Sequence, residues 1–315
     1  MKGKLMSRLA IVFPGQGSQK VGMGKDIYQE FAEVRDIFQE ASDILQKDMA
    51  LICFEGPEEI MKQTENTQPG IFLVSISLWE ILKKRGLKPE LVAGHSLGEI
   101  AAYYAAEVID LKTALELIKV RGQAMANSYP SQDSAMAAVM GLSEGQISQV
   151  LSSMEELAVM ANYNSPEQIV ISGTKKGVEL ASQRLQEIGA KRVLVLNVSG
   201  AFHSPLMQKA SDELAKFLQN KQFYDAKIPV VLNRTAQAET KQSILKENLS
   251  LQVSSPVQWV KSVQYMQNSI DTMIECGPGK VLSGLVKRIN KEIITVNVES
   301  LDSLKELIEQ KIMVG

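Results

Sequence analysis

Histidine, cysteine and tryptophan are scarce in this 315-residue sequence, with two of each. Cys53 and Cys276 lie far apart, outside any CxxC pair or Cys/His cluster, so neither a disulfide nor a metal site is expected. The net charge of -2 provides no basic footprint for nucleic acid. No apolar run approaches the length of a membrane span, and Leu9–Phe13 is too short for an export signal. We therefore expect a globular, cytoplasmic protein that binds neither nucleic acid nor membrane.

The sequence does contain a serine flanked by glycines. The apolar run Leu91–Ala93 leads into G-H-S-L-G at residues 94–98, and a helical pattern follows over Glu99–Ala106. This G-x-S-x-G pattern predicts a nucleophile elbow, a sharp strand-to-helix turn that needs glycine two residues before and after the serine. The amide of Leu97 then opens the helix and can stabilise an oxyanion. The alternative is that Ser96 only caps the helix.

A second G-x-S-x-G pattern, at residues 141–145, has a simpler interpretation. Gln146 follows Ser143 by three residues, and an apolar-periodic run begins directly after it. That order is typical of a capping box, in which the serine and the glutamine close the first turn of a helix. We therefore predict that Ser143 is a helix cap and that Ser96 is the nucleophile.

Only two histidines are available as the base for a serine nucleophile. His95 precedes Ser96, and neighbouring strand residues point to opposite faces, so we expect His95 to be a packing or hydrogen-bonding residue. His203 lies in a loop after the predicted strand Arg192–Leu196, a position that often carries catalysis on α/β scaffolds. A purely hydrogen-bonding role for His203 stays open here. No acidic residue has a context that marks it as a third member, so a Ser/His dyad is expected to suffice, with another acceptor for the histidine; a backbone carbonyl would serve without adding a charge.

The first predicted strand leads into a glycine-rich loop at residues 14–24. The loop fails as a dinucleotide fingerprint, because Lys20 stands where the third glycine of G-x-G-x-x-G is needed, and it contains no phosphate-binding P-loop. Glycines also let backbone amides approach a ligand, so Gln16 is a candidate for the second oxyanion donor. A tight strand-to-helix turn is the alternative.

Arg121 closes the helical run Lys112–Val120 and has small and apolar neighbours on its C-terminal side. An arginine binds a carboxylate through two parallel hydrogen bonds, so an acyl group that ends in a carboxylate would suit it. An internal salt bridge is the alternative, and the sequence does not choose between them.

The order of apolar and helical segments predicts two subdomains. At both ends of the chain short apolar runs alternate with helical patterns, which is typical of a parallel α/β sheet. The polar cluster Tyr129–Asp133 marks a crossing, and the βαββαβ order of a ferredoxin-like unit follows it. The predicted division is a large subdomain of residues 1–129 and 198–315, interrupted by a small one of residues 130–197.

Five separated motifs give the chain a resemblance to a known family. They are F-P-G-Q-G-S-Q at residues 13–19, G-H-S-L-G-E at 94–99, V-R-G-Q-A-M at 120–125, G-A-F-H-S-P at 200–205 and G-P-G-K-V-L at 277–282. The chain resembles malonyl-CoA:acyl carrier protein transacylases and the related acyltransferase domains of polyketide synthases, over almost its full length. The resemblance implies an α/β-hydrolase-like core with a ferredoxin-like insert and no cofactor of its own.

The resemblance also implies a role for each catalytic motif. Ser96 resembles the acylated nucleophile and His203 the base. The amides of Gln16 and Leu97 resemble the oxyanion hole. Gln252 resembles the residue whose backbone carbonyl orients the histidine, which would supply the missing third member.

Two further residues bear on the substrate. Arg121 resembles the ligand of the malonyl carboxylate, and Phe202 resembles the form of its motif that is associated with malonyl rather than methylmalonyl units. Loop packing is an equally good reason for an aromatic residue at position 202. The implied partners are malonyl-CoA and acyl carrier protein: the malonyl group passes to Ser96 and then to the phosphopantetheine thiol of the carrier.

Two other functions share these motifs. A serine hydrolase or thioesterase would use the same elbow and histidine with water as the acceptor, but it has no reason for a carboxylate ligand at Arg121. A discrete acyltransferase that loads a polyketide synthase in trans would keep every motif.

Overall fold

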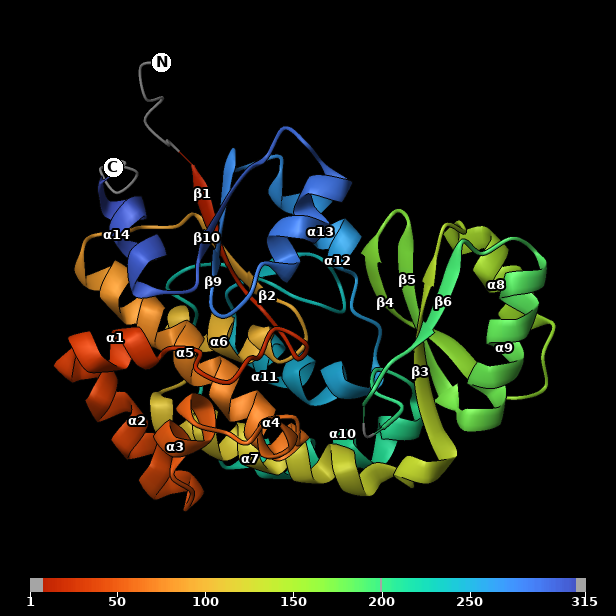
Figure 1. Cartoon of the computed structure of the whole chain (residues 1–315), viewed down its shortest axis with the longest axis horizontal. Helices are drawn as coiled ribbons and strands as arrows, with labels where there is room; N and C mark the ends of the chain where they lie inside the picture. The colour runs from red at the N-terminus through yellow and green to blue at the C-terminus, as the bar shows by residue number, and fades with distance from the viewer. Residues whose placement is uncertain (1–7, 199, 310–315) are drawn as a thin grey trace.

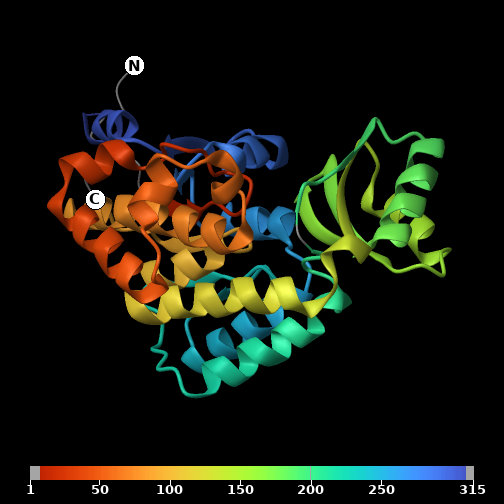
Figure 2. The same ribbon diagram turned by 60° about the horizontal axis from the view of Figure 1, so that its bottom comes forward.

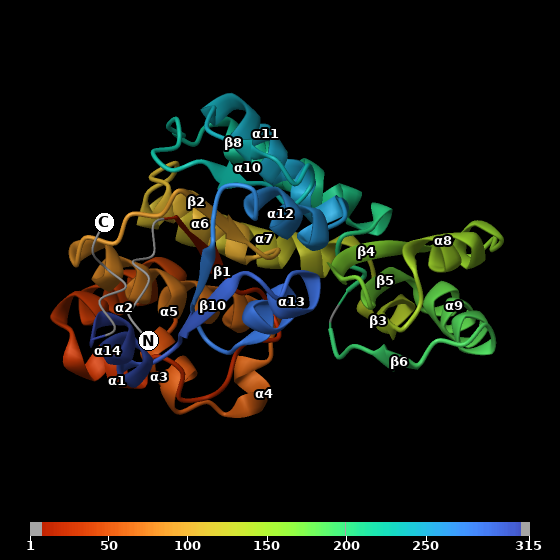
Figure 3. The ribbon, with the colours of Figure 1, turned by 90° about the horizontal axis from the view of Figure 1, so that it is seen from above.

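Two β-sheets organise the chain, of which the computed structural model describes residues 8–198 and 200–309. The larger sheet has the strand order β10-β9-β1-β2-β7-β8 and the smaller sheet the order β4-β5-β3-β6. Figures 1, 2 and 3 show the sheets in two neighbouring bodies, with the smaller body at the right. The ends of the predicted large subdomain, residues 1–7 and 310–315, lie outside the described residues, as does Ser199.

The strands of the larger sheet come from both ends of the chain. They are β1 (Leu9–Phe13), β2 (Leu91–Gly94), β7 (Val230–Val231), β8 (Ala238–Glu239), β9 (Thr272–Cys276) and β10 (Ile294–Val298). Neighbouring strands are parallel, as predicted, except that the edge strand β8, which the sequence pattern did not predict, pairs antiparallel with β7. The connection between β7 and β8 is too short for the crossover that a parallel pair requires.

Helices cover both faces of this sheet, and β1 is apolar throughout for that reason. Leu9, Ile11 and Phe13 pack into one core, whereas Ala10 and Val12 pack into a second. The helices of the larger body are α1 (Lys25–Glu30), α2 (Ala32–Leu45), α3 (Met49–Phe54), α4 (Glu58–Met61), α5 (Thr64–Lys84), α6 (Gly98–Ala105), α7 (Leu111–Ser128), α10 (Gln208–Gln219), α11 (Gln242–Leu251), α12 (Trp259–Met266), α13 (Val281–Ile289) and α14 (Leu301–Glu309). None of the helices in the described ranges combines the length and the apolar character that crossing a membrane requires.

The smaller sheet is antiparallel and has its own helices. Its strands are β3 (Ser134–Met140), β4 (Ala158–Ser165), β5 (Gln168–Thr174) and β6 (Arg192–Val195), and α8 (Glu144–Ser152) and α9 (Lys175–Glu187) lie on its outer side (Figure 1). Ser143 caps α8: its Oγ accepts from the amide of Gln146, whose side chain accepts from the amide of Ser143. The predicted capping box is confirmed.

Backbone and side-chain contacts join the two bodies. Residue Asn162 of β4 forms a parallel bridge with Val257, whose amide donates to the Ala161 carbonyl at 2.8 Å. From β3, Met136 and Ala138 pack into the core of the larger body. Figure 2 shows α7 running along the larger body toward the smaller one. The smaller body is therefore held against the larger one at several points.

Candidate active site

The turn between β2 and α6 has the strained backbone of a nucleophile elbow. Ser96 is left-handed, with φ of 52°, a conformation that few non-glycine residues adopt. A Cβ atom on Gly94 would lie 1.9 Å from the carbonyl carbon of Gly98, and one on Gly98 would lie 2.0 Å from the carbonyl oxygen of Phe13. Glycine is therefore required at both positions, as the motif predicts.

Ser96 and His203 are hydrogen-bonded across the elbow. Ser96 Oγ lies 2.7 Å from His203 Nε2. On the other side of the ring, Nδ1 lies 3.1 Å from the carbonyl oxygen of Gln252 and 3.0 Å from that of Ser255. Because both of these are acceptors, Nδ1 carries the proton and the Nε2 lone pair is free to accept the serine proton.

The surroundings of His203 keep its imidazole neutral. Burial, the positive charge of Arg121 and the nearby His95 lower the His203 pKa to about 3. An imidazole with such a pKa is unprotonated throughout the physiological range. The ring is therefore ready to accept a proton before any substrate arrives.

His95 is held by partners other than the serine hydroxyl. Its Nε2 lies 2.8 Å from Oδ1 of Asn164 in β4, and its ring meets the Trp259 ring edge-on at 5.7 Å between centroids. Burial also lowers the His95 pKa. These contacts confirm the prediction that His95 is a packing and hydrogen-bonding residue, and they tie the elbow to the smaller body.

Arg121 reaches the serine from the middle of α7. The helix continues to Ser128, which confirms the helical pattern over Leu111–Asn127 in the sequence, so Arg121 lies inside the helix and not at its end as predicted. Gly122 lies inside the helix although glycine has a low helix propensity. The nearest atom to a Cβ built on it is the Glu65 Cα in α5, 3.7 Å away, which is an ordinary van der Waals distance.

The guanidinium of Arg121 is 2% exposed and has uncharged partners. Its Nη2 donates to Ser96 Oγ and to Gln252 Oε1, both at 3.1 Å, and its Nη1 donates to Gln68 Oε1 at 2.9 Å. Its Nε is buried and has no hydrogen-bond partner among the described residues. Burial lowers the Arg121 pKa to about 10, which leaves the group charged at neutral pH. A buried cation with a spare donor is suited to bind an anion beside the serine.

A cavity of about 390 Å³ lies over the Ser96–His203 pair. It brings together six of the seven predicted site residues, namely Gln16, Ser96, Leu97, Arg121, Phe202 and His203. The seventh, Gln252, is buried and contacts the site through both its backbone and its side chain. Met125 and Met136 supply apolar surface to the same walls. The cavity thus combines a serine, a neutral base and a buried cation.

The acyl transferase domain family matches residues 10–308, which is almost the whole chain. The chain belongs to the acyl transferase family. It is 41% identical to the malonyl CoA-acyl carrier protein transacylase of Bacillus subtilis (strain 168), over 96% of this chain and 97% of the relative.

Solved structures also resemble this acyltransferase over nearly their whole length. The acyl carrier protein S-malonyltransferase of Vibrio cholerae matches with a TM-score of 0.93 and 42% identity, over 96% of this chain and 100% of that chain. A second structure, described as a type II PKS acyl-carrier protein in complex with its malonyl-transacylase, matches with a TM-score of 0.93 and 37% identity, over 96% of this chain and 99% of that chain.

The acyltransferase fixes the strained serine with side-chain amides. Asn233 Oδ1 accepts from the Ser96 amide at 2.7 Å, and Asn233 Nδ2 donates to the Gly94 carbonyl at 2.6 Å. Gln252 Nε2 donates to the Ser96 carbonyl at 2.8 Å. The backbone amide and carbonyl of the serine are therefore both held, which over-determines its left-handed conformation.

A buried carboxylate beneath the elbow organises these amides. Glu99 has no exposed surface and accepts from the Asn233 amide at 2.6 Å and from Asn248 Nδ2 at 2.7 Å. Burial raises the Glu99 pKa to about 7. The motifs did not predict Glu99, Asn233 or Ser255. Two of them leave a signal in the sequence: Glu99 is an acidic residue in a buried helix of the elbow motif, and Asn233 follows β7 at the carboxyl edge of the sheet.

Among the described residues of the acyltransferase, no group of three or more His, Cys, Asp or Glu side chains is placed to hold a metal ion.

Proposed function

We propose that this acyltransferase moves a malonyl group from malonyl-CoA to the phosphopantetheine thiol of acyl carrier protein through a malonyl-Ser96 intermediate. The observation that carries the proposal is the position of Arg121: its buried guanidinium donates to Ser96 Oγ at 3.1 Å and keeps an unused Nε donor. An acyl group on this serine that ends in a carboxylate meets that charge. The names of the relatives point to the same substrate and acceptor.

In the first half-reaction, Ser96 Oγ attacks the thioester carbonyl carbon while His203 Nε2 takes the serine proton. The carbonyl oxygen becomes an oxyanion, which the backbone amides of Gln16 and Leu97 stabilise. When the C–S bond breaks, the imidazolium gives its proton to the departing CoA thiolate. The Gln252 and Ser255 carbonyls stabilise the transient imidazolium through the Nδ1 proton.

The second half-reaction reverses these roles with a different thiol. His203 takes the proton of the phosphopantetheine thiol, and the resulting thiolate attacks the malonyl ester on Ser96. The oxyanion forms in the same place, the C–O bond breaks, and the proton returns to Ser96 Oγ. No cofactor enters either half of the proposed cycle.

Arg121 and Phe202 define the acyl group that the site accepts. The guanidinium pairs with the malonyl carboxylate, while Gln68 and Gln252 hold the guanidinium in place. Phe202 is 6% exposed and lines the cavity, so its ring narrows the space beside the acyl α-carbon. This arrangement favours an unbranched malonyl unit.

Mass spectrometry of the intact protein mixed with malonyl-CoA tests the proposal. We expect one malonyl adduct, which maps to Ser96, is absent in Ser96→Ala and persists in the matched control Ser143→Ala. Addition of phosphopantetheinylated acyl carrier protein should discharge the adduct onto the carrier thiol. If free malonate is released without carrier as fast as the adduct is discharged onto the carrier, the protein is a hydrolase instead.

The identity of the acceptor separates the two pathways that share this chemistry. One relative, 37% identical, was solved with a type II PKS acyl-carrier protein. Discharge rates measured in parallel with a fatty-acid carrier and a polyketide carrier decide between them. We propose the fatty-acid carrier as the preferred acceptor, and a faster polyketide carrier would contradict this part.

The proposal also includes the predicted fold, domain division and location. An α/β-hydrolase-like core at residues 1–129 and 198–315 is supported by the six-stranded sheet built from both ends of the chain. A ferredoxin-like subdomain at residues 130–197 is supported by the order β4-β5-β3-β6 with two helices on one side. The cytoplasmic location agrees with two free, buried cysteines, Cys53 and Cys276.

A further inference from the structure

The loop between β1 and α1 carries Gln16 and forms neither helix nor strand. Its own bonds near Gln16 run from Ser18 Oγ to the Gly15 carbonyl, at 3.0 Å, and from the Gly17 amide to Gln19 Oε1, at 2.7 Å. Gly17, Gly22 and Gly24 in this loop all have positive φ values, of 105°, 91° and 77°. Glycine loses more conformational freedom on folding than any other residue, so such a loop depends on outside contacts for a fixed shape. An oxyanion donor must be held within about 0.5 Å of its productive position. Contacts from outside the loop therefore add to these bonds in fixing the Gln16 amide.

The G-P-G-K turn at residues 277–280 lies directly against this loop. A Cβ atom on Gly277 would stand 2.7 Å from the Pro14 ring, and one on Gly279 would stand 3.3 Å from the Ser18 carbonyl oxygen. Pro14 and Ser18 flank Gln16 on its two sides. The two glycines thus allow the turn to support both ends of the segment that carries the predicted donor.

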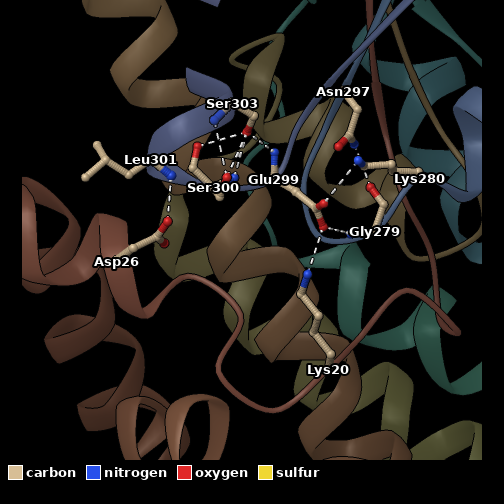
Figure 4. Close-up of polar contacts among 9 residues, drawn as sticks. All are labelled: Lys20, Asp26, Gly279, Lys280, Asn297, Glu299, Ser300, Leu301 and Ser303. Atoms are coloured by element: carbon tan, nitrogen blue, oxygen red, sulfur yellow. Dashed lines mark hydrogen bonds and ion pairs between the residues drawn. The ribbon is translucent and has the colours of Figure 1, made fainter. Parts of the chain in front are cut away.

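Glu299, which follows β10, joins the turn to the loop (Figure 4). Its Oε2 accepts from the Gly279 amide and from Lys20 Nζ, both at 3.0 Å, and its Oε1 lies 3.8 Å from Lys280 Nζ. Its side chain is only 17% exposed. Partial burial by itself raises the Glu299 pKa, but the bonds from Lys20 and Gly279 outweigh it and the pKa is lowered. The carboxylate is therefore ionised at neutral pH and shared between both segments.

Further hydrogen bonds hold the G-P-G-K turn and the segment around Glu299 in place. Asn297 Nδ2 donates to the Gly279 carbonyl at 2.6 Å, so both backbone polar groups of Gly279 are held from the end of β10. The Leu301 amide donates to Asp26 Oδ2 at 2.6 Å, which ties the start of α14 to α1 (Figure 4). The segment after β10 thus holds the β1–α1 loop at Lys20 and the start of α1 at Asp26.

We propose that Glu299 is a positioning residue for the transfer reaction, which holds the β1–α1 loop and the Gln16 amide against the G-P-G-K turn from outside the cavity. This inference rests on the proposed function, because it takes the Gln16 amide as an oxyanion donor. Loss of Glu299 leaves Lys20 and the Gly279 amide without their shared acceptor. The loop then samples more positions, and the transition state loses part of its stabilisation while ground-state binding through Arg121 is kept.

The experiment measures the rate at which malonyl-CoA acylates Ser96 in single variants of the full chain. Glu299→Ala should lower the maximal rate about ten- to a hundredfold, less than the roughly 10²–10³-fold that loss of a whole oxyanion donor costs. The malonyl-CoA concentration for half-maximal rate should stay within about twofold, because only transition-state stabilisation is removed. Glu299→Gln keeps an acceptor for Gly279 and should recover much of the rate.

Lys20 supplies the matched comparison on the loop side. Lys20→Met should slow acylation, whereas Lys25→Met should not, because Lys25 pairs at 2.7 Å with Glu55 after α3 instead. The Lys20→Met, Glu299→Ala double variant should be no slower than Glu299→Ala alone, since both residues act through one contact. Equal rates for the two lysine variants, or a changed half-maximal concentration at unchanged rate, would overturn the inference.

Thermal unfolding of each variant separates positioning from stability. If Glu299→Ala does not fold, Glu299→Gln, Lys20→Met and Lys25→Met still test the inference. Lys20→Met must be acylated more slowly than Lys25→Met, and Glu299→Gln must keep much of the wild-type rate. A wild-type protein that forms no malonyl adduct would refute the proposed function itself. A wild-type protein that is acylated no faster than its folded Glu299 and Lys20 variants would refute only the role of Glu299.

Discussion

Arg121→Ala should change which acyl group the acyltransferase accepts. In the wild type the malonyl carboxylate gains charge-assisted hydrogen bonds from a guanidinium that is almost fully buried. Removing one partner of such a pair costs about 2 to 5 kcal/mol, which is a loss in kcat/KM of roughly thirtyfold to several thousandfold. Acetyl-CoA has no carboxylate and loses none of this energy. Selectivity should therefore move toward acetyl by at least the same factor.

The ratio of the two substrates isolates carboxylate recognition from the other work of Arg121. Its hydrogen bonds to Ser96, Gln68 and Gln252 are lost for both substrates alike, so their effect cancels in the ratio. The assay is the rate of acyl-enzyme formation with malonyl-CoA and acetyl-CoA, compared as kcat/KM. An unchanged ratio in a folded variant would show that the carboxylate is bound elsewhere.

Two further variants control this measurement. Lys119→Ala removes a cation from an exposed position of the same helix and should leave the ratio unchanged. Arg121→Lys keeps the charge but not the planar fork, so it should retain part of the malonyl preference. A full loss in Arg121→Lys would mean that fork geometry, rather than charge, dominates recognition.

Four other predictions follow from the site. His203→Ala should lower acylation by about two to four orders of magnitude, the scale of general-base catalysis, and His95→Ala by less; equal losses in two folded variants would refute a single base. Because the active form of His203 is neutral and its pKa is about 3, protonation of His203 should slow acylation only as the pH falls toward that value; Glu99, with a pKa of about 7, can add an inflection of its own, so an inflection near the ordinary histidine value of about 6.5 that persists in Glu99→Gln would contradict the geometry. Gly98→Ala should lower the thermal unfolding temperature strongly, whereas Gly145→Ala, with no atom within 4 Å of its added Cβ, should not; similar values for both would refute the steric account of the elbow. Phe202→Ser should raise acylation by methylmalonyl-CoA relative to malonyl-CoA, and an unchanged ratio would leave the ring a packing role only.

Features that depend on a few consecutive residues were predictable from the sequence. The elbow follows from two glycines around a serine, and the capping box of Ser143 from a glutamine three residues later. The exclusion of His95 as the base needed only the alternation of side chains along a strand. In each case the physical cause is steric or a local hydrogen bond, so the pattern and its reason lie in the same short segment.

Features that depend on distant segments were not predictable in this way. Ser255 holds His203 through a backbone carbonyl, which leaves no preference for any side chain at position 255. Asn233 reaches the Ser96 amide across 137 positions of sequence. The position of Asn233 after β7 is visible in the sequence, but the atoms that it reaches depend on how distant segments pack.

The charge of Arg121 acts on His203 as well as on the substrate. The rate of the chemical step, and not only binding, should therefore differ between malonyl and acetyl groups. Arg121 lies beside the Ser96–His203 pair and lowers the His203 pKa, so it opposes the imidazolium that must form when the serine attacks. A bound malonyl carboxylate compensates the guanidinium charge and removes that opposition, because two opposite charges in contact act weakly on a third group. An acetyl group brings no such charge, so its transfer proceeds against the full field of Arg121. Removing the arginine should therefore raise kcat for acetyl transfer while it lowers kcat for malonyl transfer, a reciprocal change that loss of binding alone would not produce.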